Sequence, residues 1–270
     1  EAYLCRPPQL ALDRFRIITG TAFGEHDRSW IKLNMPDDPT VTIEDVTSQY
    51  ACIGLWGPRA RVILQRVTKS NVANAAFPYM TAQNIAVGDV PTLAVRVTYV
   101  GELGWEFYCS MEYGQRLWDV LWQAGQSDGI IAAGYRAIDS LRLEKGYRYW
   151  GADITPDYTP FEAGMGFAVR LDGSTGSPRN FIGRDALVKQ KAEGIQRKLG
   201  CLSLADQTAI ALGNEPVRHG DKIVGWITSG GYGYTVGKSI AYAYLPLEHS
   251  KVGTILDVEL FGERVAATVE

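Results

Sequence analysis

The stretch Tyr99-Val-Gly-Glu-Leu-Gly-Trp-Glu106 decides how the first half of this sequence folds. The segment before it, Leu93–Val97, alternates in side-chain size and polarity with the period of a strand, and so does Trp105–Cys109, which begins within it. Between them, Gly101–Gly104 is typical of a turn, because glycine tolerates the backbone angles that a tight turn demands. The pattern predicts an antiparallel hairpin whose glutamate points away from the aromatic residues on either side of it.

Helical patterns lie on both sides of this hairpin. Gly57-Pro58 opens a helix, since proline suits the first helical position, and the apolar residues that follow recur at i, i+3, i+4 and i+7. Met111–Gln123 is amphipathic, with Ser110 as its expected N-cap. Tyr135–Lys145 is a further helix, closed by a glycine.

Strand patterns dominate the last third of the chain. Lys222–Thr228, Ser239–Leu245 and Thr254–Leu260 alternate or run apolar, with glycine-rich turns between them. Arg179–Leu199 is the best boundary region. We therefore predict an α+β fold, with a mixed region at residues 1–178 and an all-β module at residues 179–270.

Composition excludes several classes of function. With 46% hydrophobic and 21% charged residues, the 270-residue chain suits a globular protein with a sizeable core. A net charge of −3 gives no basic face, so nucleic acid is not an expected partner. No apolar run of about 18 residues appears, so no membrane partner is expected. There is no secretory signal peptide, and the non-methionine start predicts a piece of a longer protein.

Cysteine usage argues against a metal site. The four cysteines form no C-x-x-C pair, and the chain has three histidines. Isolated cysteines of this kind are typical of reduced core residues, which predicts a reducing, cytoplasmic location. The cysteines are Cys5, Cys52, Cys109 and Cys201.

Three further motifs follow the opening stretch along the chain. The first is Asp139–Gly146 (DSLRLEKG), the second is Asn180–Leu187 (NFIGRDAL), and the third combines Gly225–Gly231 (GWITSGG) with Ser239–Pro246. Each is weak alone, but together they resemble the glycine-cleavage T-protein (aminomethyltransferase) family from about Phe15 onward. Details such as Leu143–Arg148 resemble the subgroup fused to dimethylglycine and sarcosine dehydrogenases.

The resemblance implies a fold and a function. The implied fold is a cloverleaf of three modules around a central folate hole, truncated at the N-terminus relative to the family. Phe15 to about Asp45 would belong to the second module, Tyr50 to about Leu171 to the first, and residues 179–270 would form a β-barrel or jelly roll. The implied function is transfer of a one-carbon unit from a methylated amine to tetrahydrofolate, giving 5,10-methylenetetrahydrofolate. A flavin-containing amine dehydrogenase domain or subunit would be the partner.

The resemblance also implies a folate-binding site. Glu106 matches the family's pterin-binding glutamate, and one carboxylate can accept two neighbouring N–H donors of a pterin edge. Tyr99 matches a tyrosine that lies against the folate. Thr19 and Gly20 occupy the strand end where family backbone groups meet the pterin. Without the resemblance, Glu106 would be a solvated strand residue and Tyr99 a core tyrosine.

Two positions depart from the family pattern. An arginine that helps to hold the pterin is replaced by Ile138, with Arg136 two residues earlier. The family's catalytic aspartate would fall near Tyr3, and no aspartate precedes Asp13. No catalytic residue is therefore assigned, and a non-catalytic folate-binding module is the alternative function.

Other members of the superfamily fit less well. Iron–sulfur repair proteins carry a cysteine in a K-G-C-Y-x-G-Q motif, whereas Lys145–Gly151 has none. Demethylation of a sulfur or aryl-ether methyl donor stays open.

Overall fold

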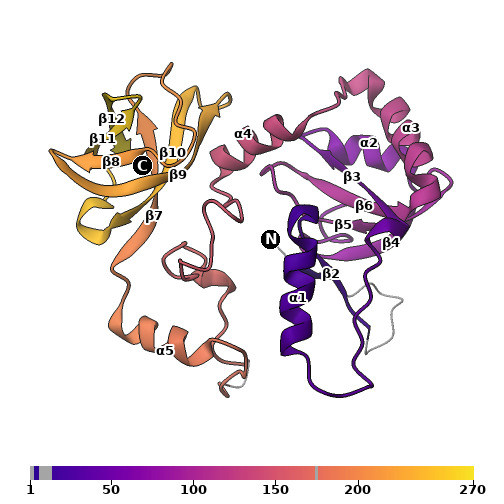
Figure 1. The fold of residues 1–270 in the computed structure, drawn as a ribbon. Helices are drawn as coiled ribbons and strands as arrows, with labels where there is room; N and C mark the ends of the chain where they lie inside the picture. Colours follow the sequence, from indigo (N-terminus) through magenta and orange to yellow (C-terminus); the bar gives the residue numbers. More distant parts are fainter. Residues whose placement is uncertain (1–2, 6–13, 174–175) are drawn as a thin grey trace. The chain divides into compact units, whose positions relative to one another are not determined.

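The computed structural model describes residues 3–5, 14–173 and 176–270 (Figure 1). Its contacts divide the chain into two compact units, Glu1–Ala133 and Gly134–Glu270. Each unit has a hydrophobic core of its own. The contact-based division comes before the strands of the second unit, which begin at Arg197. The proposed three-module organisation stays a prediction.

Unit 1 is built on an antiparallel four-stranded sheet in the order β3-β6-β5-β4, and a separate two-stranded sheet pairs β1 with β2. Its strands are β1 (Tyr3–Cys5), β2 (Arg16–Ile18), β3 (Tyr50–Trp56), β4 (Ala82–Val87), β5 (Val90–Val95) and β6 (Gly104–Ser110). Its helices are α1 (Gly24–Asn34), α2 (Ala60–Val67) and α3 (Gly114–Gly125).

The core of unit 1 lies between one face of this sheet and helices α2 and α3 (Figure 1). Trp105, Phe107 and Cys109 point into it from β6 and are at most 2% exposed. Burying aromatic side chains of this size is a main source of core stability. The opposite sheet face carries the other residues of β6, as the alternation predicts.

The predicted hairpin is confirmed, with a longer connection than expected. β5 and β6 pair antiparallel, with Val95 opposite Glu106. The connection runs from residue 96 to 103. Arg96, which follows the last residue of β5, does not pair with β6 but exchanges backbone hydrogen bonds with residues 80 and 81 at 3.0 and 2.9 Å. The four-residue turn is therefore only the last part of the connection.

Ser110 occupies the predicted N-cap position, but of a 3₁₀ turn and not of helix α3, and its side chain makes no capping bond. It is the last residue of β6, and the 3₁₀ turn that follows it spans Met111–Tyr113. Helix α3 begins at Gly114, where an added Cβ would lie 2.9 Å from the Cβ of Ala51. The glycine thus permits a close approach between α3 and β3.

Unit 2 contains a closed antiparallel barrel in the order β10-β7-β12-β11-β8-β9. The helices that precede it are α4 (Tyr135–Lys145) and α5 (Arg184–Glu193). Its strands are β7 (Arg197–Leu204), β8 (Pro216–His219), β9 (Lys222–Gly233), β10 (Lys238–Pro246), β11 (Ile255–Leu260) and β12 (Glu263–Val269). Small and aliphatic side chains fill the barrel interior. The predicted α+β class with a C-terminal barrel is confirmed.

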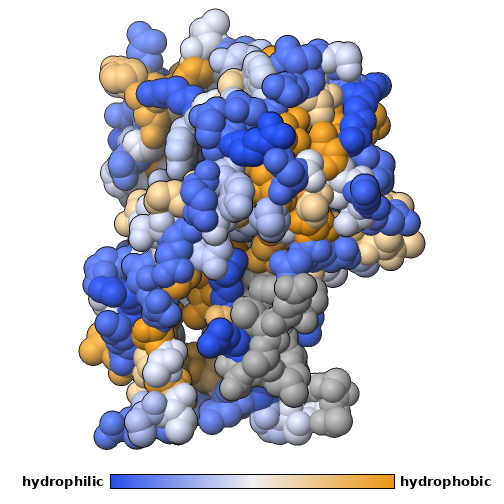
Figure 2. Space-filling view, turned by 90° about the vertical axis from the view of Figure 1, so that its right-hand side faces the viewer, coloured by the Kyte–Doolittle hydropathy of each residue, from blue (hydrophilic) through white to orange (hydrophobic). Residues whose placement is uncertain are grey.

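The exposed surface mixes polar and apolar residues. Figure 2 shows one side, on which hydrophilic side chains predominate and hydrophobic ones gather in smaller areas. Among the residues that the structure describes, no helix combines the length and the hydrophobicity needed to cross a bilayer.

Candidate functional site

The candidate site lies on the face of the four-stranded sheet that points away from α2 and α3. Glu106 is in the middle of β6 and is half-buried, with Gly54 of β3 on one side and Val95 of β5 on the other. Its neighbours in sequence, Trp105 and Phe107, are fully buried on the opposite face. Strand alternation thus fixes which way this carboxylate points.

Tyr108 holds the Glu106 carboxylate. Two residues along the same strand and on the same face, its hydroxyl donates to Oε2 of Glu106 at 2.5 Å. A hydrogen bond to a carboxylate is short and strong, so it fixes the rotamer of the glutamate. It uses one of about four acceptor positions that a carboxylate has.

An aromatic ring lies beside this carboxylate. A Cβ added at Gly54, directly across from Glu106, would collide with the indole ring of Trp56, so the ring occupies the space where a side chain at position 54 would lie. The indole Nε1 donates to the carbonyl of Val97 at 3.1 Å, which fixes the orientation of the ring. The face therefore combines a positioned carboxylate with a positioned aromatic surface.

Cys52 is a third side chain on this face. It lies across from Tyr108 and is exposed. Desolvation of the thiolate, followed by the negative charge of Glu106, raises the pKa of this thiol to about 11. Exposure decides whether a reagent reaches the sulfur, whereas the pKa decides how much reactive thiolate is present.

We expect Cys52 to react slowly with iodoacetamide at pH 8. A pKa of about 11 instead of 9.0 leaves about 100-fold less thiolate at that pH, so the rate should rise about tenfold per pH unit up to pH 10. Glu106→Gln removes a negative charge and should accelerate the reaction. Peptide mass spectrometry measures the rate, with Cys52→Ser as the assignment control. A fast, pH-insensitive reaction at Cys52 would contradict this electrostatic picture.

The end of β2 approaches the same face. Ile18 packs against the buried cluster of Leu93, Val95 and Val97, as Tyr108 of β6 also does. The next residue, the half-buried Thr19, donates its hydroxyl to the Asp27 carboxylate. Burial acts to raise the pKa of Asp27, but hydrogen bonds from Thr19 and His26 outweigh it, and the pKa is lowered overall.

The other residues singled out from the sequence differ in burial and in the element that carries them. Gly20 is exposed, and an added Cβ there would make only ordinary contact with Phe23 at 3.7 Å, so space does not require a glycine. Tyr99 is half-buried in the connection between β5 and β6. Ile138 and Arg136 are on α4 in unit 2, half-buried and exposed respectively. The side chain expected near the family's aspartate position, that of Tyr3, is outside the described residues.

Sequence reasoning missed three residues of this face. Tyr108 could have been found, because alternation places it on the same side as Glu106. Trp56 and Cys52 join the face through the register between β3 and β6, which residue patterns alone do not supply. A hollow of about 420 Å³ lies elsewhere, beside α2, and none of these residues lines it.

Two family domains match the chain, one after the other. The GCVT N-terminal domain matches residues 8–173, and the glycine cleavage T-protein C-terminal barrel domain matches residues 197–270. The second match covers all the strands of the barrel.

Two relatives show the same relationship in sequence, and one solved structure shows a similar fold. The chain is 38% identical over 256 residues to mitochondrial dimethylglycine dehydrogenase from Homo sapiens, covering 94% of the chain but 29% of that protein. It is 35% identical over 259 residues to an aminomethyltransferase from Symbiobacterium thermophilum, covering 95% of the chain and 68% of that protein. The crystal structure of glycine cleavage system aminomethyltransferase T from Bartonella henselae matches with a TM-score of 0.81 at 24% identity, covering 100% of the chain and 70% of that structure.

The family matches cover most of both units, including the sheet that carries Glu106 and the whole barrel. The resemblance inferred from four short motifs is confirmed over most of the chain. The chain belongs to the glycine cleavage T-protein family.

Proposed function

We propose that this chain binds tetrahydrofolate and transfers a one-carbon unit to it from a methylated amine, forming 5,10-methylenetetrahydrofolate. The observation that carries the proposal is the Glu106 carboxylate, held by Tyr108 and flanked by Trp56. A pterin edge presents an amino group and a ring N–H side by side, and one carboxylate can accept both. The same flat ring system can stack on an indole.

The residues of the face fit such a ligand. The carboxylate supplies orientation, the indole supplies apolar contact, and both are fixed by hydrogen bonds before a ligand arrives. Preorganisation of this kind reduces the entropy lost on binding. When bound, tetrahydrofolate supplies the nitrogen nucleophiles that capture the carbon. Thr19, Gly20 and Tyr99 complete the proposed folate site, and its catalytic group is unassigned.

The proposal also requires a flavin-containing domain or subunit that oxidises the amine. The chain spans 29% of the length of the dimethylglycine dehydrogenase that it matches. Its sequence has no glycine-rich fingerprint for flavin phosphates. We therefore assign amine oxidation to a flavin-containing domain or subunit, and capture of the carbon to this chain.

Titration calorimetry tests the folate site directly. We expect saturable heat with tetrahydrofolate and with its 5-formyl analogue, and quenching of fluorescence from Trp56 on binding. The variant Trp56→Phe should bind while losing that quenching, because it keeps an aromatic ring. No heat with either ligand at millimolar concentration would overturn the proposal.

The alternative function is a module that binds folate without turnover. It is favoured by the absence of any aspartate before Asp13 in this sequence, where the resemblance implies a catalytic aspartate at or near Tyr3. A proton-handling group is worth about 10²–10⁴ in rate. We therefore expect the isolated chain to accelerate methylenetetrahydrofolate formation from formaldehyde and tetrahydrofolate by less than about tenfold. Stopped-flow absorbance measures the rate, and a strong, saturable acceleration would favour the catalytic function instead.

A further inference from the structure

Two arginines converge on one oxygen on the side of the sheet opposite Glu106. Arg61, on α2, donates from Nη2 to Oδ1 of Asn74 at 2.5 Å. Arg96, just after β5, donates from its own Nη2 to the same oxygen at 2.7 Å. Two positive guanidinium groups therefore share a single neutral acceptor.

No carboxylate balances this charge within the described part of the chain. Ion pairs involving other arginines are present, including Arg59 and Arg66, which both bind Asp128, but none involves Arg61 or Arg96. Burial, and then the charge of Arg61, lower the pKa of Arg96 from its ordinary value. Like charges held together in this way destabilise one another unless an anion lies between them.

The same place has a surplus of N–H donors. Nε of Arg61 and Nε1 of Trp105 are buried and have no hydrogen-bond partner among the described residues. The Arg96 guanidinium carbon lies 5.7 Å from the centre of the Trp105 ring, and its Nη1 donates to the carbonyl of Phe77 at 2.5 Å. Unpaired donors add to the positive potential of the two guanidinium groups, so the cluster favours an anionic ligand with several acceptor oxygens.

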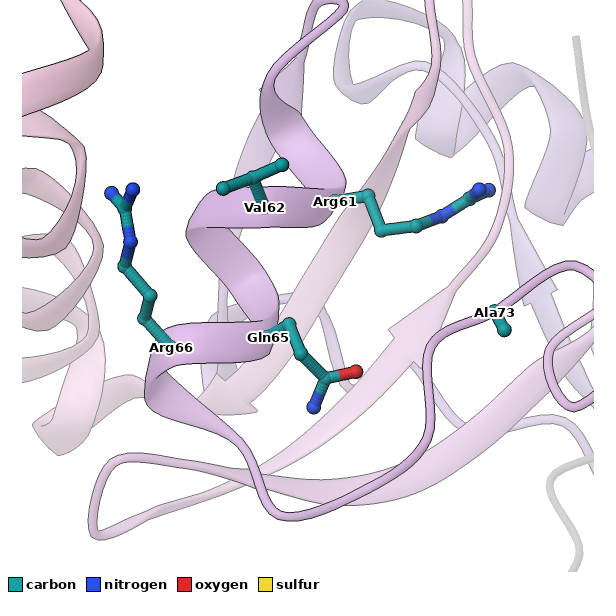
Figure 3. A pocket seen from close by; sticks show the side chains of 5 residues that line it. All are labelled: Arg61, Val62, Gln65, Arg66 and Ala73. Carbon is teal, nitrogen blue, oxygen red and sulfur yellow. The ribbon is translucent and has the colours of Figure 1, made fainter.

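A hollow adjoins Arg61. It has a volume of about 420 Å³ and is lined by Arg61, Val62, Gln65, Arg66 and Ala73. Figure 3 shows Arg61 and Gln65 reaching from α2 towards the loop that carries Ala73, whereas Arg66 points to the other side of the helix.

The loop across from α2 is held in place before any ligand binds. Gln65 donates to the carbonyls of Thr68 and Ser70 at 3.2 and 3.1 Å and accepts from the backbone N–H of Val72 at 3.4 Å. Val72 and Phe77 anchor the loop in the core and are 0% exposed. Asn74, which both arginines contact, lies between these two anchors.

We propose that Arg61, Arg96 and Asn74 mark a binding site for an organic phosphate monoester. A phosphate group carries about −1.5 to −2 charges at pH 7 and three strong acceptor oxygens, which match two guanidinium groups and their spare donors. Guanidinium groups bind phosphate oxygens in a bidentate manner. The hollow beside Val62 and Ala73 accommodates the organic part. Because the sheet separates this site from Glu106, it is independent of the proposed folate site.

Phenyl phosphate titrated into the full chain by calorimetry, at ionic strength fixed with KCl, tests the site. We expect saturable binding that is tighter than that of inorganic phosphate, because the hollow takes the ring. Arg61→Gln should weaken it at least tenfold, while Arg61→Lys should restore part of the affinity. Arg61 is chosen because Arg96 also holds the Phe77 carbonyl and its loss could disturb folding.

Matched variants distinguish binding at this site from binding elsewhere on the surface. Arg116→Gln removes an exposed arginine of the same unit and should leave phenyl phosphate binding unchanged. Glu106→Gln should also leave it unchanged, whatever its effect on folate binding. Three results would overturn the proposal: no saturable binding at millimolar concentration, equal affinity in Arg61→Gln with an unchanged circular dichroism spectrum, or tighter binding of benzoate than of phenyl phosphate.

Discussion

Replacing Asp153 with alanine is expected to lower the free energy of unfolding of unit 2 by about 3–5 kcal/mol. Asp153 is 0% exposed, and one of its carboxylate oxygens accepts from Nη1 of Arg142 at 2.7 Å. Arg142 is itself only 4% exposed. Removing the aspartate would leave a buried, permanently charged guanidinium without its only buried carboxylate partner among the described residues, with just the exposed Asp139 still paired to it, and such a change is among the most destabilising in a protein.

The bonds around this pair explain why the loss would spread through the unit. The Asp153 carboxylate also accepts from the backbone N–H of Tyr149 at 2.8 Å and from the Thr228 hydroxyl at 2.5 Å. Nη2 of Arg142 donates to the Ser229 hydroxyl at 3.0 Å. Helix α4, the loop after it and barrel strand β9 are therefore joined at one buried point.

Asp139→Ala is the matched control for Asp153→Ala. Asp139 binds Nε of the same arginine at 2.7 Å, but its side chain is 60% exposed. Exposed ion pairs contribute about 0–1 kcal/mol, so this variant should unfold almost like the parent. Urea denaturation followed by circular dichroism and tryptophan fluorescence separates the transitions of the two units. Equal losses in the two variants would contradict the central role given to the buried pair.

This network shows what residue patterns can and cannot predict. The helix that carries Arg142 is read from the sequence with the bounds that the structure has, Tyr135–Lys145, because periodicity and a closing glycine are local signals. Gly146 takes the left-handed conformation, with φ of 84°, that such a closing position needs. Asp153 gives no local signal. Its position depends on an irregular loop whose conformation is set by contacts with strands about 75 residues later.

The candidate site divides in the same way. Alternation along β6 is enough to put Glu106 and Tyr108 on one face and Trp105 on the other. The contribution of Trp56 depends on a glycine directly across from Glu106, and therefore on the register of β3 against β6. Strand β4 is not among the predicted strands, although the tight Gly88-Asp89 connection to β5 is a local hairpin signal. Register and distant contacts are thus what the sequence leaves undetermined.

Glu106→Gln is expected to weaken tetrahydrofolate binding about 10- to 100-fold, and more than Tyr99→Phe does. A hydrogen bond to a charged group is worth about 1.5–3 kcal/mol, and the amide replaces one acceptor oxygen with a donor that faces the donors of the pterin. Its shape is almost unchanged, so the effect reports on charge and acceptor capacity. Tyr99→Phe keeps the aromatic face and loses only a hydroxyl, which predicts a change within about fivefold.

Glu102→Gln is the matched control for this comparison. Glu102 lies four residues before Glu106, in the connection between β5 and β6, and is exposed. The same chemical change there should leave folate affinity unaltered, because a solvated carboxylate loses nothing that water does not supply. Calorimetric dissociation constants for the parent and the three variants, at one pH and ionic strength, decide the matter. Parent-like binding by both Glu106→Gln and Tyr99→Phe would mean that the pterin binds elsewhere. Equal losses of folate affinity in Glu102→Gln and Glu106→Gln would mean that the net charge of the protein, and not a contact with Glu106, causes the effect.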